Sequence, residues 1–187
     1  MLHGARRLLN SLHEVGPPVK TTSSQPGHLK GNLDYVLITF SRVRVLVAED
    51  FSPFCQFIFS TLAKRPNLQV VCAVSDGLEA IQQAEVLAPD LVLLDIGLPT
   101  LNGIEAARQI RRLVPKSKIV FVSQESSVEV VRAALSIGAS GYIAKTRAEQ
   151  DILAAVDAVL AGGRFVSAGL SYENFTAAGP TPSIKVP

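Results

Sequence analysis

Five short apolar runs alternate with five amphipathic segments between Arg42 and Gly162. The apolar runs predict β-strands at residues 43–48, 68–74, 91–95, 118–122 and 141–144. The other segments have apolar residues at helical spacing and predict helices at about residues 52–64, 77–87, 102–114, 128–137 and 148–161. A repeated strand–helix order requires a parallel sheet with helices on both faces. The pattern therefore predicts an α/β fold with a doubly wound, five-stranded sheet, because an eight-unit barrel would need roughly 250 residues.

Local signals support the predicted helix ends. Ser52 followed by Pro53 is typical of an N-cap and the first helical residue. The second helix is expected to end before Pro89, because proline disfavours helical backbone in the residue that precedes it. Gly138 suits the left-handed cap that ends many helices.

The segments on either side of this region differ from it in composition. Residues 1–41 hold a leucine-containing stretch stopped by prolines and then a Ser/Thr-rich linker. They predict a flexible N-terminal extension, to which the sequence assigns no function. Residues 163–187 are rich in Gly, Ala, Ser and Pro, and they predict a linker or tail that is too short for another domain. The predicted domain itself spans residues 42–162.

Composition narrows the class of protein. With 48% hydrophobic and 18% charged residues, the chain is typical of a globular protein, and its net charge of +2 is too small to indicate nucleic-acid binding. No window is apolar enough for a membrane span, and no signal peptide is evident. The cysteines, Cys55 and Cys72, lack metal-type spacing and predict small core residues in a reducing compartment. We therefore expect a cytoplasmic protein without a membrane partner.

Four of the predicted strands end in residues that can do chemistry. Glu49 and Asp50 follow the first strand, Asp95 ends the third, Ser123 the fourth and Lys145 the fifth. The carboxyl ends of parallel strands share one edge, where ligands of open α/β sheets bind. Three carboxylates there repel one another, and one lysine compensates only part of their charge. The remaining negative charge favours Mg²⁺, and such a cluster suits the stabilisation of a phosphoryl group.

These motifs resemble the receiver domain of two-component response regulators. The resemblance covers roughly residues 42–162 and rests on five motifs in the expected order: the acidic pair Glu49-Asp50, Asp95, Pro99, Ser123 and the run Gly141-Tyr142-Ile143-Ala144-Lys145. It implies a flavodoxin-like fold with strand order 2-1-3-4-5. It also implies a function in phosphorelay signalling.

The resemblance implies a role for each acidic residue. Asp95 would accept a phosphoryl group from a phosphohistidine of a sensor histidine kinase or phosphotransfer protein. Asp50 would bind Mg²⁺ directly and Glu49 through water, while Asp95 and the backbone carbonyl of Gly97 would complete the protein ligands.

It likewise implies a switch that catalyses its own phosphorylation and dephosphorylation and is otherwise not an enzyme. Lys145 would pair with a phosphoryl oxygen. Ser123 would move towards the phosphoryl group, and Tyr142 would change rotamer in response. The surface so altered would bind an output partner that the sequence does not identify, and a homodimer is compatible with the resemblance.

Two other readings of Asp95 are left open. One is a receiver-like module that binds partners without being phosphorylated, although such modules usually lack an acid or the lysine. The other is a phosphatase with an aspartate nucleophile. Phosphatases of the haloacid dehalogenase type carry a second Asp two residues after the first, where this chain has Gly97.

The sequence departs from the commonest receiver pattern at Thr146, where many receivers have a proline that favours a cis peptide bond. Gln124 is larger than the residue often found there, and we expect it to shield the acyl phosphate and alter its lifetime. Residues 161–167 resemble the linker that leads to a LuxR-type helix-turn-helix in one subfamily. No such helix pattern or basic stripe follows, so direct DNA binding is not expected from this chain.

Overall fold

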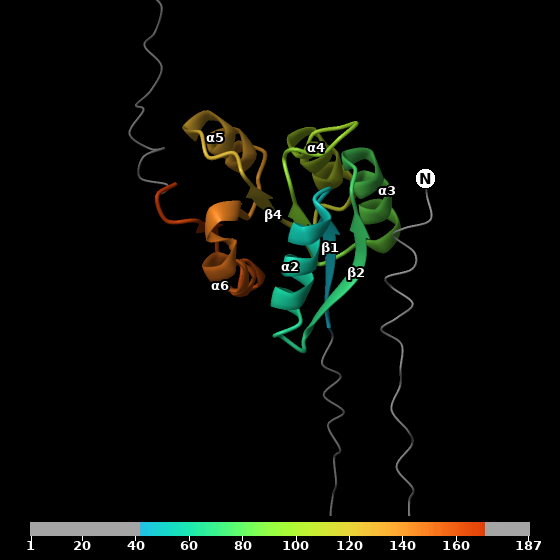
Figure 1. Cartoon of the computed structure of the whole chain (residues 1–187). Helices are drawn as coiled ribbons and strands as arrows, with labels where there is room; N and C mark the ends of the chain where they lie inside the picture. Colours follow the sequence, from blue (N-terminus) through green and yellow to red (C-terminus); the bar gives the residue numbers. More distant parts are fainter. Residues whose placement is uncertain (1–41, 171–187) are drawn as a thin grey trace, which may run out of the picture. The chain divides into compact units, whose positions relative to one another are not determined.

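A six-stranded parallel sheet lies at the centre of the computed structural model, which describes residues 42–170 (Figure 1). Its strands are β1 (Val43–Ala48), β2 (Leu68–Val74), β3 (Leu91–Leu94), β4 (Lys118–Ser123), β5 (Gly141–Ala144) and β6 (Phe165–Val166). They lie side by side in the order β2-β1-β3-β4-β5-β6, and every neighbouring pair is parallel. The first five strands confirm the predicted doubly wound sheet and its flavodoxin-like order.

Helices cover both faces of this sheet. They are α2 (Ser52–Leu62), α3 (Gly77–Leu87), α4 (Gly103–Leu113), α5 (Val128–Ser136) and α6 (Ala148–Leu160), with a short 3₁₀ helix, η2 (Lys145–Arg147), directly before α6. Helices α2 and α6 pack on one face, and α3, α4 and α5 pack on the other. The strands supply both cores because their side chains alternate between the faces. In β1, for example, Val45 and Val47 face α2 and α6, while Leu46 and Ala48 face the other layer.

The sixth strand corrects the prediction that the sheet has five. Phe165–Val166 lies within the segment that was expected to be a linker, yet it pairs with Gly141 and Tyr142 of β5. A strand of two residues is too short to show an alternating pattern, so the sequence did not reveal it. Residues 1–41 lie outside the described part of the chain, and the proposed domain division remains a prediction.

Helix α3 ends at Leu87, before Pro89 as expected, but the signal at the start of α2 was misread. Asp76 caps α3 and Asn102 caps α4 through their side-chain oxygens. The N-cap of α2 is Phe51, without a side-chain hydrogen bond, so the prediction that Ser52 is the cap was wrong by one residue. Gly138 has a positive φ of 87° just after α5, as its predicted capping role requires.

A glycine at the start of α4 allows this helix to lie close to the backbone of Asp95. A Cβ atom at Gly103 would lie 1.9 Å from the carbonyl oxygen of Asp95, and the Gly103 amide donates to the carbonyl of Ile96 at 2.9 Å. Only a residue without a side chain allows the start of α4 to approach the end of β3 so closely.

Two further expectations concern the backbone and the membrane. No peptide bond within residues 42–170 is cis, so the bond from Lys145 to Thr146 is trans. Among the helices of the same residues, none is long and apolar enough to cross a membrane.

Candidate functional site

Three carboxylates meet at the carboxyl edge of the sheet, as the sequence predicts. Glu49 and Asp50 follow β1, and Asp95 follows the neighbouring strand β3. One oxygen from each lies within 4.8 Å of the others. Glu49 and Asp95 are buried, whereas Asp50 is exposed at the edge of the cluster. Three negative groups this close repel one another, so the cluster suits a divalent cation with oxygen ligands.

Lys145 supplies the positive charge that faces this cluster. Its Nζ atom lies 2.8 Å from Oδ2 of Asp95 and 2.9 Å from Oε1 of Glu49. Only 10% of the Lys145 side chain is exposed, and Nζ also lies 4.8 Å from the centre of the Phe54 ring. Burial alone would lower the pKa of Lys145, but the hydrogen bonds to Asp95 and Glu49 outweigh it and raise this pKa. Lys145 is therefore held in its charged form.

The side chain of Glu49 is not fully satisfied by the protein. Its Oε1 accepts hydrogen bonds from Lys145 and from the amide of Phe51. Its Oε2 is buried and forms an ion pair of 2.8 Å with Nζ of Lys145. Burial raises the pKa of Glu49, against the opposite effect of Lys145. A buried carboxylate oxygen with a single partner retains a free lone pair, which a cation or an ordered water would use.

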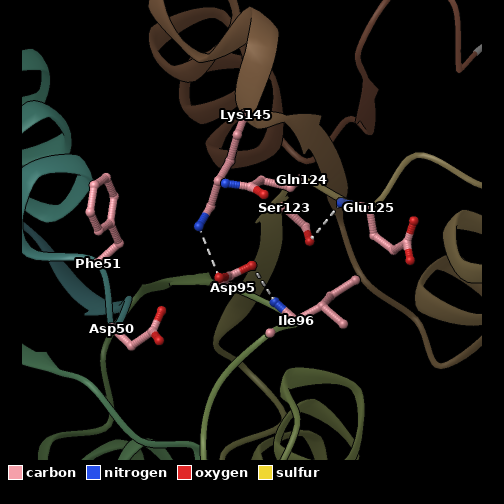
Figure 2. Close-up of a pocket in the computed structure, with 9 residues that line it drawn as sticks. Asp50, Phe51, Asp95, Ile96, Ser123, Gln124, Glu125 and Lys145 are labelled. Carbon is pink, nitrogen blue, oxygen red and sulfur yellow. Dashed lines mark hydrogen bonds and ion pairs between the residues drawn. The ribbon is translucent and has the colours of Figure 1, made fainter.

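The carboxylate of Asp95 is fixed at both oxygens. Oδ1 accepts a hydrogen bond of 2.7 Å from the amide of Ile96, and Oδ2 accepts the one from Lys145 (Figure 2). Gly97 follows on the exposed loop, and a Cβ atom there would lie 3.6 Å from Oδ2 of Asp95. The backbone of Gly97 therefore runs beside the carboxylate, but no acid stands at this position.

An open cavity of about 600 Å³ lies above Asp95. Figure 2 shows Asp50 and Phe51 on one side of Asp95, with Ser123 and Gln124 on the other and Lys145 above. The cavity residues are Asp50, Phe51, Asp95, Ile96, Gly97, Ser123, Gln124, Glu125 and Lys145. Six of the seven residues predicted for the site are thus cavity residues or, like Glu49, belong to its acidic cluster.

Tyr142 is the exception, because it is fully buried between the sheet and the helices. Its hydroxyl donates a hydrogen bond of 2.6 Å to the backbone carbonyl of Glu125. The amide of the same Glu125 donates to Oγ of Ser123 at 3.2 Å. Burial raises the pKa of Tyr142 to about 12, although a hydrogen bond with Ser123 lowers it in part. Ser123 and Tyr142 are therefore connected through the loop between β4 and α5.

Sequence reasoning missed four contributors to this site. Phe51, Ile96 and Glu125 act through backbone atoms, which leave no signal in the residue type. Phe54 was counted only as part of a helix, yet its ring lies against the ammonium group of Lys145. Its position in the first turn of the helix that follows the acidic pair was the available hint.

Comparison with known proteins matches residues 45–157 to the family model of the response regulator receiver domain. The chain is 30% identical over 126 residues to the transcriptional regulatory protein DegU of Brevibacillus brevis, a match that covers 67% of this chain and 53% of DegU. It is 33% identical over 131 residues to the response regulator GacA of Pseudomonas viridiflava, covering 70% of this chain and 61% of GacA. The chain thus spans somewhat more than half the length of these relatives.

A solved structure gives a similar result. The two-component response regulator of the LuxR family from Aurantimonas sp. SI85-9A1 superposes with a TM-score of 0.66 at 29% identity, covering 70% of this chain and 93% of that one. The signal receiver domain of the NarL regulator from Mycobacterium tuberculosis superposes with a TM-score of 0.62 at 27% identity, covering 65% and 98%.

Proposed function

The chain belongs to the response regulator receiver family of two-component signalling proteins, and from this premise we propose that Asp95 is its phosphoacceptor. The observation that carries the proposal is the position of the Asp95 carboxylate. It faces an open cavity, lies among two further carboxylates, and has Lys145 Nζ 2.8 Å from Oδ2. The immediate phosphoryl donor would be a phosphohistidine of a sensor histidine kinase or phosphotransfer protein.

In the proposed reaction, an Asp95 carboxylate oxygen attacks the phosphorus atom of the donor. A new O–P bond forms, the P–N bond breaks, and the departing imidazole nitrogen takes up a proton. Lys145 then compensates negative charge on the transferred group, since its Nζ already lies within hydrogen-bond distance of Asp95. The amide of Ile96 fixes the carboxylate for attack.

The acidic cluster is the proposed site for Mg²⁺. Glu49, Asp50 and Asp95 would provide carboxylate oxygens, and Gly97 would add its backbone carbonyl. The buried Oε2 of Glu49, which keeps acceptor capacity beside its ion pair with Lys145, fits this role, directly or through water. When bound, the ion would neutralise charge on the carboxylates and on the phosphoryl oxygens.

Ser123 and Tyr142 are the proposed switch residues. A phosphoryl group on Asp95 would offer an acceptor to the hydroxyl of Ser123, which lines the same cavity. Moving Ser123 would disturb its hydrogen bond with the Glu125 amide, and the Glu125 carbonyl is the partner of Tyr142. The loop between β4 and α5 would thereby transmit a local charge change to an outer surface.

Receivers of this kind are signalling proteins, and we propose that the chain catalyses its own phosphorylation and dephosphorylation and acts on no external substrate. An output partner would recognise the surface altered by the switch, and self-association through that surface is the homodimer compatible with the family. We also propose a cytoplasmic location, where the phosphohistidine donor is available.

Acetyl phosphate with Mg²⁺ provides the direct test. The intact mass of the wild-type protein should rise by about 80 Da, as one phosphoryl group requires. Asp95→Asn should remove this species, and EDTA should suppress it. Asp90→Asn is a matched control, because Asp90 lies at the opposite end of β3 from Asp95. Its carboxylate accepts a hydrogen bond from the Arg44 amide.

The alternatives give different results. A receiver-like module that only binds partners would show no added mass in the wild type. A phosphatase would hydrolyse phosphomonoesters with sustained turnover. A species of added mass that persists in Asp95→Asn would place the modification elsewhere and contradict the proposal.

A further inference from the structure

A buried polar network connects the chain after α6 to the backbone next to Lys145. Its centre is Ser167, a fully buried residue directly after β6. Oγ of Ser167 donates a hydrogen bond of 2.5 Å to Oδ2 of Asp151 and accepts one of 3.1 Å from the amide of Ala144. Ala144 is the last residue of β5 and directly precedes Lys145.

Asp151 extends the network across the first turn of α6. It is 7% exposed, and its Oδ2 also accepts a hydrogen bond of 3.1 Å from Nε of Arg147. Arg147 closes the 3₁₀ turn that begins at Lys145. A buried charge needs partners, and here they are drawn from the segment before α6 and the segment after it.

The backbone of Ser167 adds a second connection to the same strand. Its amide donates to the carbonyl of Tyr142 at 2.9 Å, which extends the pairing between β5 and β6. Ser167 therefore contacts β5 at Tyr142 and at Ala144. These residues precede Lys145 by three positions and by one.

This network has no part in phosphoryl transfer itself, because none of its side chains lines the cavity above Asp95. The position of the network next to Lys145 indicates a structural role instead. Lys145 must place Nζ between Asp95 and Glu49. The backbone next to Lys145 is bonded to Ser167 through the amide of Ala144, and Asp151 joins Ser167 to the side chain of Arg147 two residues after Lys145.

We propose that Ser167 and Asp151 are positioning residues for Lys145, so that docking of the segment 165–167 on β5 is needed for full activity of the phosphorylation site. The proposal rests on the proposed function of Asp95 and Lys145. It makes the chain after α6 part of the site, because a change that lifts Ser167 from β5 would release the backbone at Ala144.

The test compares Ser167→Ala with wild type at saturating acetyl phosphate and Mg²⁺. Removing the hydroxyl should lower the rate constant of phosphorylation by about three- to tenfold, since small displacements of positioned groups have effects of this size or larger. The apparent affinity for Mg²⁺ should change less than this rate constant, because Glu49 and Asp50 follow β1, whereas the hydrogen bonds of Ser167 are to β5 and α6. Exchange of the Ala144 amide with solvent should become faster.

Two further variants separate positioning from general damage. Asp151→Asn keeps an oxygen that can accept the Ser167 hydrogen bond and should retain most of the rate, whereas Asp151→Ala should behave like Ser167→Ala. Ser136→Ala is the matched control, because the Ser136 hydroxyl donates only to the carbonyl of Ala133 in its own exposed turn.

The proposal is overturned if folded Ser167→Ala is phosphorylated at the wild-type rate. It is also overturned if the loss of rate equals the unfolded fraction measured under the same conditions, or if Mg²⁺ affinity falls by the same factor. If the wild type itself gains no phosphoryl group, the proposed function fails instead. In that case the proposed positioning of Lys145 is tested by two other measurements on Ser167→Ala. These are the exchange rate of the Ala144 amide and the NMR signal of the Lys145 ammonium group.

Discussion

The hydroxyl of Tyr142 donates a hydrogen bond of 2.6 Å to the backbone carbonyl of Glu125. The two residues are 17 positions apart in sequence, and the bond joins the centre of β5 to the loop between β4 and α5. The amide of Glu125 is in turn bonded to Ser123. One residue therefore connects both predicted switch residues through its backbone. Any movement of Ser123 towards Asp95 acts on the partner of Tyr142.

Tyr142→Phe should weaken this connection without leaving a cavity in the core. Phenylalanine retains the buried ring, but the Glu125 carbonyl loses its donor, so the free energy of unfolding should fall by about 1 kcal/mol. Urea denaturation of the protein without phosphoryl group measures this change. The loop around Glu125 should also exchange its amides faster, while amides of α2 serve as the control. Unchanged exchange in the loop would show that the bond does not hold it.

The same phenol should ionise only in strong alkali. Burial raises the pKa of Tyr142 to about 12, whereas the phenol of an unfolded chain ionises near 10. The unfolded state therefore loses a proton first as pH rises. The contribution to stability is complete below pH 10 and is lost between about pH 10 and 12, by roughly 3 kcal/mol in total. Denaturation at pH 8 and pH 11 measures the loss, which should be smaller in Tyr142→Phe. An equal loss in both proteins would assign it to other groups.

Gln124 is expected to alter the lifetime of the acyl phosphate. It lines the cavity beside Ser123 and Lys145, and its exposed side chain can restrict water near Asp95 (Figure 2). Gln124→Ala should change the half-life of phosphorylated protein, with faster hydrolysis if shielding dominates. The decay of the added mass after removal of acetyl phosphate gives the half-life. Ser126→Ala, in the same exposed loop but outside the cavity, is the control, and equal half-lives for all three proteins would remove the idea.

Mg²⁺ should stabilise the fold through the acidic cluster. A ligand at ten times its Kd adds about 1.4 kcal/mol to the free energy of unfolding when it binds only the folded state. Asp50→Asn should lose most of this gain while staying as stable without Mg²⁺, because Lys145 contacts Glu49 and Asp95 and not Asp50. Thermal denaturation with and without Mg²⁺ tests both statements. An undiminished Mg²⁺ effect in Asp50→Asn would place the ion elsewhere, and Asp90→Asn controls for loss of charge.

Much of the candidate site could be predicted because parallel strands share one carboxyl edge. Glu49, Asp95, Ser123 and Lys145 each end or follow an apolar run, so the strand pattern alone brings them together. The contacts of Lys145 with Glu49 and Asp95 could not be predicted, because no sequence pattern indicates which carboxylate oxygen a lysine contacts.

The remaining features escaped prediction for physical reasons. Ile96 and Glu125 contribute backbone groups that every residue carries. The strand Phe165–Val166 has only two residues, too few to show an alternating pattern, and Ser167 contacts β5 because it directly follows this strand. Ser52 was taken as an N-cap from its type, but the chain places Phe51 there.

Gly103 offers a strict test of how the fold presents Asp95. In Gly103→Ala the new Cβ atom would lie 1.9 Å from the Asp95 carbonyl oxygen, so the loop or the start of α4 must move. Forced backbone shifts of this kind cost about 1–3 kcal/mol or more. Because one of the two clashing backbone segments is that of Asp95, phosphorylation by acetyl phosphate should slow beyond the loss expected from unfolding alone.

Gly97→Ala is the matched stability control for this substitution. Its Cβ would lie 3.6 Å from the nearest atom, Oδ2 of Asp95, which is an ordinary contact, and the backbone of Gly97 does not require a positive φ. Its free energy of unfolding should therefore remain within about 1 kcal/mol of wild type. Urea denaturation of both variants compares the two glycines directly. If Gly103→Ala were as stable as Gly97→Ala, the close approach of α4 to β3 would not be what holds Asp95 at the edge of the cavity.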